Sequence, residues 1–202
     1  MDKNIDYYFW INSDWAYLGA QRLDALAARH GVGINYRLVD LPDVYRRTGG
    51  VLLGQRSPER QAYRIAELKR WCRLLETPVN PQPAFMCPNG DLASRLVIAA
   101  LEVPQPITPL YTRILQAEWC DDEDISDPTV LRRILAEQGY AAQAIFDRAA
   151  QPDIEARYRK NTDDAVAAGV FGSPSYVYDG EVFWGQDRLD MLDRAITLER
   201  AG

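Results

Sequence analysis

The chain has 202 residues, 47% of them hydrophobic and 26% charged, which suits one large domain or a small domain carrying an insertion. Its formal net charge of −6 gives no basic surface for nucleic acid. Its three cysteines form no C-x-x-C pair, its N-terminus lacks the apolar core of a signal peptide, and it has no long aliphatic run, so we expect a cytoplasmic protein without a metal site or membrane span.

The N-terminal segment predicts a strand, a helix and a second strand. Residues 5–11, "IDYYFWI", are rich in β-branched and aromatic residues, as in a buried strand. A helix is expected from Ala16 to His30, since apolar residues recur at helical spacing and Gly31 is a typical C-cap. Residues 33–41 read as the second strand. Short connections predict a right-handed crossover, and therefore parallel pairing.

The middle of the chain predicts almost only helices. Residues 43–54 are expected to form a loop, and Pro58 then begins a long helix that runs to Leu75. A proline-rich passage follows it. Further helices are expected over 92–101, 108–119, 128–138, 141–149 and 152–168.

The C-terminal segment returns to strands. Residues 174–185 predict two short strands around Asp179-Gly180, a strong hairpin signal, and a last helix is expected over 187–199. With the helical block removed, the order of elements is that of thioredoxin. We therefore predict an α/β, thioredoxin-like fold with an all-α insertion, in which residues 1–54 and 169–202 form a discontinuous thioredoxin-like domain and residues 55–168 an inserted helical domain.

The turn between the first strand and the first helix carries the first candidate site. Asn12, Ser13 and Asp14 lie together there, and any of the three can cap the helix. The residues alone leave Ser13 either as a cap or as the group that holds a reactive atom. Both roles are compatible if a neighbour does the capping. His30, the only histidine, precedes a helix end, which argues against a Ser-His-Asp triad.

Two stretches, "YYFWINSDWAYLGAQRL" and "AGVFGSPSYVYDGEVFWGQDRLDML", resemble the 2-hydroxychromene-2-carboxylate isomerases. This family is related to the kappa-class glutathione transferases and to the DsbA-like thiol oxidoreductases. The resemblance covers essentially the full chain and includes "RTGG" and "SPERQAY". It implies a thioredoxin-like fold, glutathione as cofactor, a small aromatic acid as substrate, and a homodimer.

The resemblance also implies a glutathione site. Ser13 matches the serine that hydrogen-bonds the glutathione sulfur. Pro174 matches a proline that is usually cis, and the backbone of Ser173 before it is expected to pair with the tripeptide. Gln186 and Asp187 match the pair that receives the γ-glutamyl end, although Asp187 could equally cap the last helix.

Two arginines complete the implied site. Arg60 matches a lysine near the glycyl carboxylate of glutathione, and Arg46 matches a lysine near the aromatic substrate, where it would anchor the acidic end. Both could equally be solvated surface charges. In the implied reaction the glutathione thiolate adds to the substrate, a bond rotates or the ring reopens, and the thiolate leaves again.

Two other functions stay open: a kappa-like transferase that releases the adduct, and a non-catalytic thioredoxin-fold binding module. Dithiol–disulfide exchange through C-x-x-C is ruled out, because "SDWA" occupies the corresponding position. Asp14 replaces the family's proline, and its carboxylate would raise the thiol pKa unless it points along the helix or to solvent. Gly50 replaces an asparagine, which removes about 0.5–1.5 kcal/mol of hydrogen bonding to glutathione.

Overall fold

The computed structural model describes residues 4–201. Its strands are β1 Ile5–Phe9, β2 Ile34–Leu38, β3 Ser175–Tyr178 and β4 Glu181–Trp184. Its α-helices are α1 Asp14–His30, α2 Leu41–Thr48, α3 Pro58–Leu75, α4 Asp91–Ala100, α5 Thr108–Trp119, α6 Pro128–Glu137, α7 Ala142–Ala149, α8 Pro152–Ala167 and α9 Leu189–Ala201. Short 3₁₀ turns cover Leu53–Gln55 and Gln186–Arg188.

The four strands form one mixed sheet in the order β2-β1-β3-β4. β1 pairs with β2 in parallel, as the strand–helix–strand order predicts, and with β3 in antiparallel fashion. The hairpin between β3 and β4 turns at Asp179 and Gly180, whose φ angles of 51° and 79° suit a tight turn of the type that Asp-Gly favours. These features confirm the predicted thioredoxin-like arrangement.

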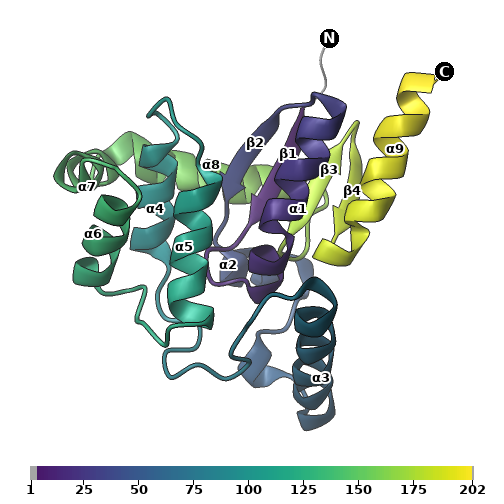
Figure 1. Ribbon diagram of the computed structural model, residues 1–202, viewed down its shortest axis with the longest axis horizontal. Helices are drawn as coiled ribbons and strands as arrows, with labels where there is room; N and C mark the ends of the chain where they lie inside the picture. Colours follow the sequence, from purple (N-terminus) through teal and green to yellow (C-terminus); the bar gives the residue numbers. More distant parts are fainter. Residues whose placement is uncertain (1–3, 202) are drawn as a thin grey trace.

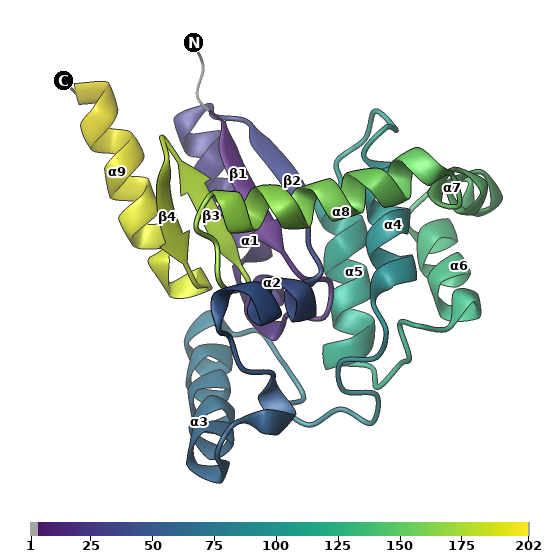
Figure 2. The same cartoon turned by 180° about the vertical axis from the view of Figure 1, so that it is seen from behind.

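Helices cover both faces of the sheet. α1 and α9 lie on one face, and α2 and α8 lie on the other (Figures 1 and 2). α4 to α7 gather beside the β2 edge, while α3 stands near the end of the sheet at which β1 and β2 finish. The N-terminus of α1 opens at this same end. In the described part of the chain, no helix is both long and apolar enough to cross a membrane.

The core runs from the sheet into the helical block without a break. The Tyr7 ring stacks between Phe9 and Tyr176, with ring centroids 4.5 and 5.3 Å away. Phe9 also contacts Tyr111 of α5 at 4.9 Å, and all four rings are buried. Aromatic packing of this kind joins the sheet to the segment between the two halves. The domain boundaries at residues 54 and 168 stay a prediction.

Two sequence expectations were wrong in detail. Residues 43–48, predicted as loop, belong to α2, because Asp40 caps this helix by accepting from the Asp43 N–H at 3.2 Å. Gly49 ends it in the left-handed region, with φ 83°. The last helix begins at Leu189, two residues later than expected, since Gln186–Arg188 forms a 3₁₀ turn.

Candidate active site

Two adjoining cavities open at the end of the sheet that carries the N-terminus of α1. Cavity 1, of about 440 Å³, is bordered by the Asn12–Trp15 turn, α2, the 52–56 segment and α3. Cavity 2, of about 710 Å³, lies between α3 and the 184–188 segment at the end of the hairpin. Both volumes suit small ligands. The residues that line both cavities are Trp15, Tyr45, Arg56, Arg64 and Ser173.

Ser13 lies in the wall of cavity 1 and is itself the N-cap of α1. Its Oγ accepts from the Ala16 N–H at 3.2 Å, which satisfies one of the free N–H groups at the helix start. The same hydroxyl donates to the Ser173 carbonyl at 3.4 Å. That second bond is long and therefore weak, so the hydroxyl proton can turn to a better acceptor at little cost. Of the residues that the sequence offered as caps, Ser13 is therefore the one that caps α1, and its role toward a thiol stays a prediction.

Ser173, near the C-terminal hairpin, is hydrogen-bonded to the turn between β1 and α1 near the N-terminus. The Ser173–Pro174 peptide is cis, as the resemblance implies. The Ser173 Oγ accepts from the Trp10 N–H at 2.8 Å, while its carbonyl faces Ser13. Because Ser173 lines both cavities, it marks the boundary between them.

Asp14 adopts neither of the two expected directions. Its side chain is buried and lines cavity 1, where one oxygen accepts from the Trp15 N–H at 2.8 Å and the other pairs with Arg64 of α3. Burial raises the pKa of the Asp14 carboxyl, and the Arg64 guanidinium acts against that rise. Arg64 also donates to the Pro81 carbonyl at 3.2 Å and lies over the Trp119 ring. The charge that replaces the family's proline is therefore balanced within the site.

Behind this turn lies a second buried carboxyl group. Glu118 is 0% exposed and accepts from the Asn12 side-chain amide at 3.2 Å and from the Cys87 N–H at 2.8 Å. Burial raises the pKa of Glu118 to about 8, so the group is largely protonated at neutral pH. Burial also raises the pKa of the Cys87 thiol to about 12, and this cysteine in the cavity wall is therefore no thiolate nucleophile.

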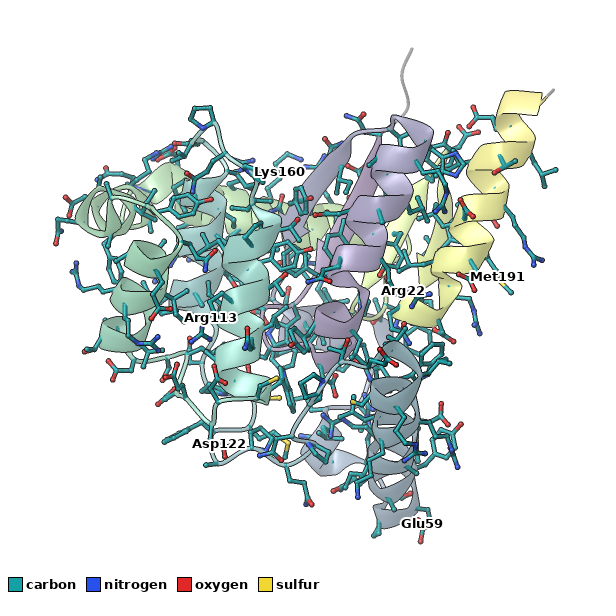
Figure 3. The ribbon with its side chains drawn as sticks, in the orientation of Figure 1. Arg22, Glu59, Arg113, Asp122, Lys160 and Met191 are labelled. Atoms are coloured by element: carbon teal, nitrogen blue, oxygen red, sulfur yellow. The ribbon has the colours of Figure 1, made fainter. Side chains whose placement is uncertain are left out.

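Cavity 2 brings together four of the residues that the resemblance assigns to glutathione: Arg60, Gln186 and Asp187 for its two ends, and Ser173 for its backbone. Gln186 is buried. Its side-chain oxygen and its backbone oxygen both accept hydrogen bonds from the Arg22 guanidinium, while its amide nitrogen has no hydrogen-bond partner. Arg22 reaches it from α1, on the side of that helix that faces α9 (Figure 3). Asp187 is exposed and pairs with Arg188 at 2.7 Å rather than capping a helix.

Arg60 is exposed on the first turns of α3 and, among the described residues, makes no ion pair with a carboxylate. A free cation thus borders the same cavity as Gln186, a buried residue whose amide nitrogen has no hydrogen-bond partner. Such groups fit a ligand that carries carboxylates.

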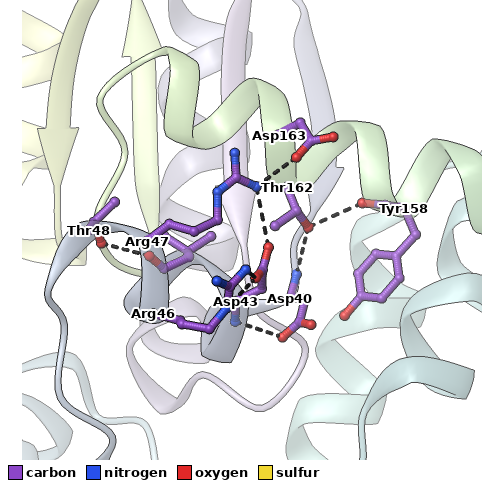
Figure 4. A network of polar contacts seen from close by, with 9 residues as sticks. Asp40, Asp43, Arg46, Arg47, Thr48, Tyr158, Thr162 and Asp163 are labelled. Atoms are coloured by element: carbon purple, nitrogen blue, oxygen red, sulfur yellow. Dashed lines mark hydrogen bonds and ion pairs between the residues drawn. The ribbon is translucent and has the colours of Figure 1, made fainter.

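Arg46 lies apart from both cavities. Its side chain is 74% exposed and pairs with Asp43 of its own helix, with Nε 3.1 Å from the carboxylate. Figure 4 shows this pair within a surface network that also contains Arg47 and Asp163. The structure does not bring Arg46 together with the other predicted site residues.

Sequence reasoning missed the arginines that do line cavity 1, Arg56 and Arg64. Arg64 follows Arg60 by four residues on a helix, and that spacing could have placed both on one face. Arg56 lies in the 3₁₀ turn region before α3 and carries no comparable signal. One of its terminal nitrogens donates to the hydroxyl of Tyr45, whose ring occupies the space beside Gly50.

Comparisons with known proteins agree with the fold. Residues 4–197 match the model of the DSBA-like thioredoxin domain family. A 2-hydroxychromene-2-carboxylate isomerase of Sphingobium xenophagum is 32% identical over 195 residues, covering 96% of this chain and 97% of the relative. One from Pseudomonas sp. (strain C18) is 30% identical over 95% of this chain and 89% of its own. A solved 2-hydroxychromene-2-carboxylate isomerase structure superimposes with a TM-score of 0.77 at 25% identity, over 96% of this chain and 94% of that one.

Proposed function

The chain belongs to the 2-hydroxychromene-2-carboxylate isomerases within the DSBA-like thioredoxin domain family, and from this membership we propose that it isomerises an aromatic acid with glutathione as its cofactor. The observation that carries the proposal is the meeting of two cavities at Ser173, beside Ser13 and the start of α1. One cavity has groups suited to a tripeptide with two carboxylates, and the other has largely apolar walls.

The residues present fit glutathione. The unpartnered amide nitrogen of Gln186 offers a donor to the γ-glutamyl end, and Asp187 offers an exposed carboxylate to its amine. Arg60 offers a free guanidinium to the glycyl carboxylate. When bound, glutathione supplies a thiolate that adds to the substrate reversibly.

Ser13 is the residue that would stabilise the thiolate. A free thiol titrates near ~8.5, and lowering that pKa by two units needs roughly 2.7 kcal/mol of preference for the anion. The Ser13 hydroxyl can donate to sulfur once it releases the Ser173 carbonyl, which contributes about 1.5–3 kcal/mol as a charge-assisted bond. The N-terminus of α1 adds about 0.3–1 kcal/mol. Arg64 offsets the opposing charge of Asp14.

The test is a calorimetric titration of glutathione into the wild-type protein and into Ser13→Ala, with ultraviolet absorbance to follow the thiolate. We expect wild-type binding with a thiolate signal that Ser13→Ala loses. Ser126→Ala is the matched control, since Ser126 lies in the loop before α6, donates to Asp124 and lines neither cavity. Absence of binding at millimolar glutathione would contradict the proposal.

Two further measurements complete the proposal. Recovery of unchanged glutathione after turnover supports an isomerase, whereas stoichiometric consumption supports a kappa-like transferase. The homodimer implied by the resemblance and the cytoplasmic location expected from the composition are part of the same proposal. Sedimentation of the purified protein tests the dimer.

A further inference from the structure

Cavity 1 carries an unbalanced positive charge. Among the described residues its charged lining consists of Asp14, Arg56 and Arg64. Asp14 and Arg64 form a buried ion pair, with side chains only 7% and 9% exposed, so their charges cancel locally. Arg56 makes no ion pair with any described carboxylate. One guanidinium charge is thus left over in a cavity whose other walls are mostly apolar, and a cation of this kind attracts an anionic ligand.

Arg56 is held in place by hydrogen bonds that leave some of its N–H donors free. Its Nε donates to the Val51 carbonyl at 2.9 Å, and one terminal nitrogen donates to the Tyr45 hydroxyl at 3.3 Å. Its own carbonyl accepts from the Gln61 side chain at 2.8 Å, which ties the backbone to α3. A guanidinium has five N–H donors in a fixed fork, so donors remain for a carboxylate.

Tyr45 can support Arg56 only because residue 50 is glycine. A Cβ on Gly50 would lie 2.2 Å from Cδ1 and 2.4 Å from Cγ of the Tyr45 ring, closer than real Cβ contacts allow. With glycine there, the ring packs against the backbone of the 49–50 turn and turns its hydroxyl to Arg56. Gly50, Tyr45 and Arg56 therefore act as one unit.

The walls around this charge suit a flat aromatic body. Trp10, Trp15, Leu41, Ile65 and Met86 border cavity 1. Aromatic and aliphatic side chains of this kind bury a planar ring, while a few placed polar groups orient it.

We propose that Arg56, positioned by Tyr45, is the receptor for the carboxylate of the aromatic acid in cavity 1. This inference rests on the proposed function for the identity of the ligand as an aromatic acid. It assigns to Arg56 the role that the sequence resemblance gives to Arg46. Arg56 borders both cavities, but cavity 2 has a second unpaired cation in Arg60, which does not line cavity 1. We therefore assign the glycyl carboxylate of glutathione to Arg60 and the carboxylate of the aromatic acid to Arg56.

The experiment uses two stable probes: chromone-2-carboxylate, a bicyclic aromatic acid, and chromone, the same ring system without the carboxylate. Binding is followed by tryptophan fluorescence, because Trp10 and Trp15 border cavity 1. The variants are Arg56→Gln, Arg56→Lys, Tyr45→Phe and the control Arg46→Gln, which removes an exposed arginine outside both cavities. Calorimetry with glutathione is run on each variant, and circular dichroism checks folding.

We expect Arg56→Gln to weaken binding of chromone-2-carboxylate by about 10- to 100-fold, the loss typical of a hydrogen bond to a charged group. Chromone and glutathione should bind it as they bind the wild type. Arg56→Lys keeps the positive charge but loses the forked guanidinium, and Tyr45→Phe keeps the ring but loses the hydroxyl. Both should therefore weaken binding of chromone-2-carboxylate less than Arg56→Gln does. Arg46→Gln should change nothing.

Several results would overturn the assignment: equal acid affinity in Arg56→Gln, an equal loss in Arg46→Gln, or an equal loss for chromone. Loss of glutathione binding with unchanged acid binding would move Arg56 to the tripeptide. Arg56-dependent binding of the acid by a protein that binds no glutathione would leave this inference standing and defeat only the proposed function.

Discussion

Glu118 is a carboxyl group with no access to solvent, and it supports the turn that carries Ser13. It accepts from the Asn12 amide and the Cys87 N–H, and its pKa rises to about 8 because it is buried. The charges of Asp14 and Arg64 also face it and act in opposite directions on that pKa. The proton on this single residue therefore couples folding to pH.

We expect the free energy of unfolding to fall as pH rises from about 4.5 to about 8. The unfolded chain releases the Glu118 proton near its ordinary pKa of 4.5, while the folded protein keeps it until about 8. The folded state then binds the extra proton, so its stabilisation is complete below pH 4.5 and is lost toward pH 8.

Glu118→Gln stays neutral at every pH. Between about pH 4.5 and 8 it should therefore reduce the pH dependence of the free energy of unfolding by about 1.4 kcal/mol per pH unit. Urea unfolding at pH 5, 6, 7 and 8 measures it. Glu181→Gln, an exposed glutamate of β4, is the control and should follow the wild type. Parallel curves for wild type and Glu118→Gln would contradict the assignment of the slope to Glu118.

At the level of elements, α1 and α3 are joined by the Asp14–Arg64 pair, which connects the first residue of α1 to the middle of α3. Both side chains are almost fully buried. Removing one partner of such a pair leaves the other charge without compensation, whereas removing both leaves no buried charge. α3 stands away from the main body, so this contact helps to hold it over the two cavities (Figure 1).

A double-mutant cycle tests this connection. We expect Asp14→Asn and Arg64→Met each to destabilise the protein by about 3–5 kcal/mol, and the double variant to lose clearly less than the sum. Asp14→Asn keeps the oxygen that accepts from the Trp15 N–H, so the helix start is preserved. The measurement is urea unfolding of all four proteins. Additive losses would mean that the two residues stabilise α1 and α3 independently.

At the scale of the whole molecule, N-terminal and C-terminal segments of the chain both contribute to cavity 2. They approach each other at Gly19 of α1, where a Cβ would lie 2.9 Å from the Tyr176 hydroxyl and 3.0 Å from Cβ of Gln186. Only a glycine lets α1 approach the residues around the hairpin so closely. The position of Gln186 in cavity 2 thus depends on a missing side chain far away in the sequence.

Gly19→Val should displace Gln186, lower the affinity for glutathione and destabilise the fold by about 1–3 kcal/mol through overpacking. Ala25→Val is the matched control, since it places the same β-branched residue on an exposed position of α1. Calorimetry and urea unfolding report the two effects. Unchanged glutathione affinity in a folded Gly19→Val protein would show that the contact does not position Gln186.

Local signals explain what the sequence could predict. Asp179-Gly180 fixes the hairpin within its own turn, and helical periodicity places α3 correctly from Pro58 to Leu75. Interactions between distant segments explain what it could not. Asp14 finds its partner fifty positions later on another helix, and no local pattern marks Arg64 as that partner.

The same reason applies to Arg46 and Arg56. Arg46 matches a family position, yet it lies on a helix where the sequence predicts a loop, and this helix turns it toward Asp43 and solvent. Arg56 reaches cavity 1 through its contact with Tyr45, which depends on backbone space at Gly50. Such dependence on three-dimensional packing is invisible in a single sequence. The roles of Ser13, Ser173 and Gln186 toward glutathione stay predictions.

The two cavities share only five lining residues and otherwise use different parts of the chain. Leu41, Leu52 and Met86 border cavity 1 alone, while Trp184 and Gln186 border cavity 2 alone. Natural selection can therefore change the shape of one cavity through residues that do not line the other. Under the proposed function, substitutions at positions that border cavity 1 alone, among them Leu41, Leu52 and Met86, adapt a lineage to new aromatic carbon sources and leave the cavity proposed for glutathione unchanged.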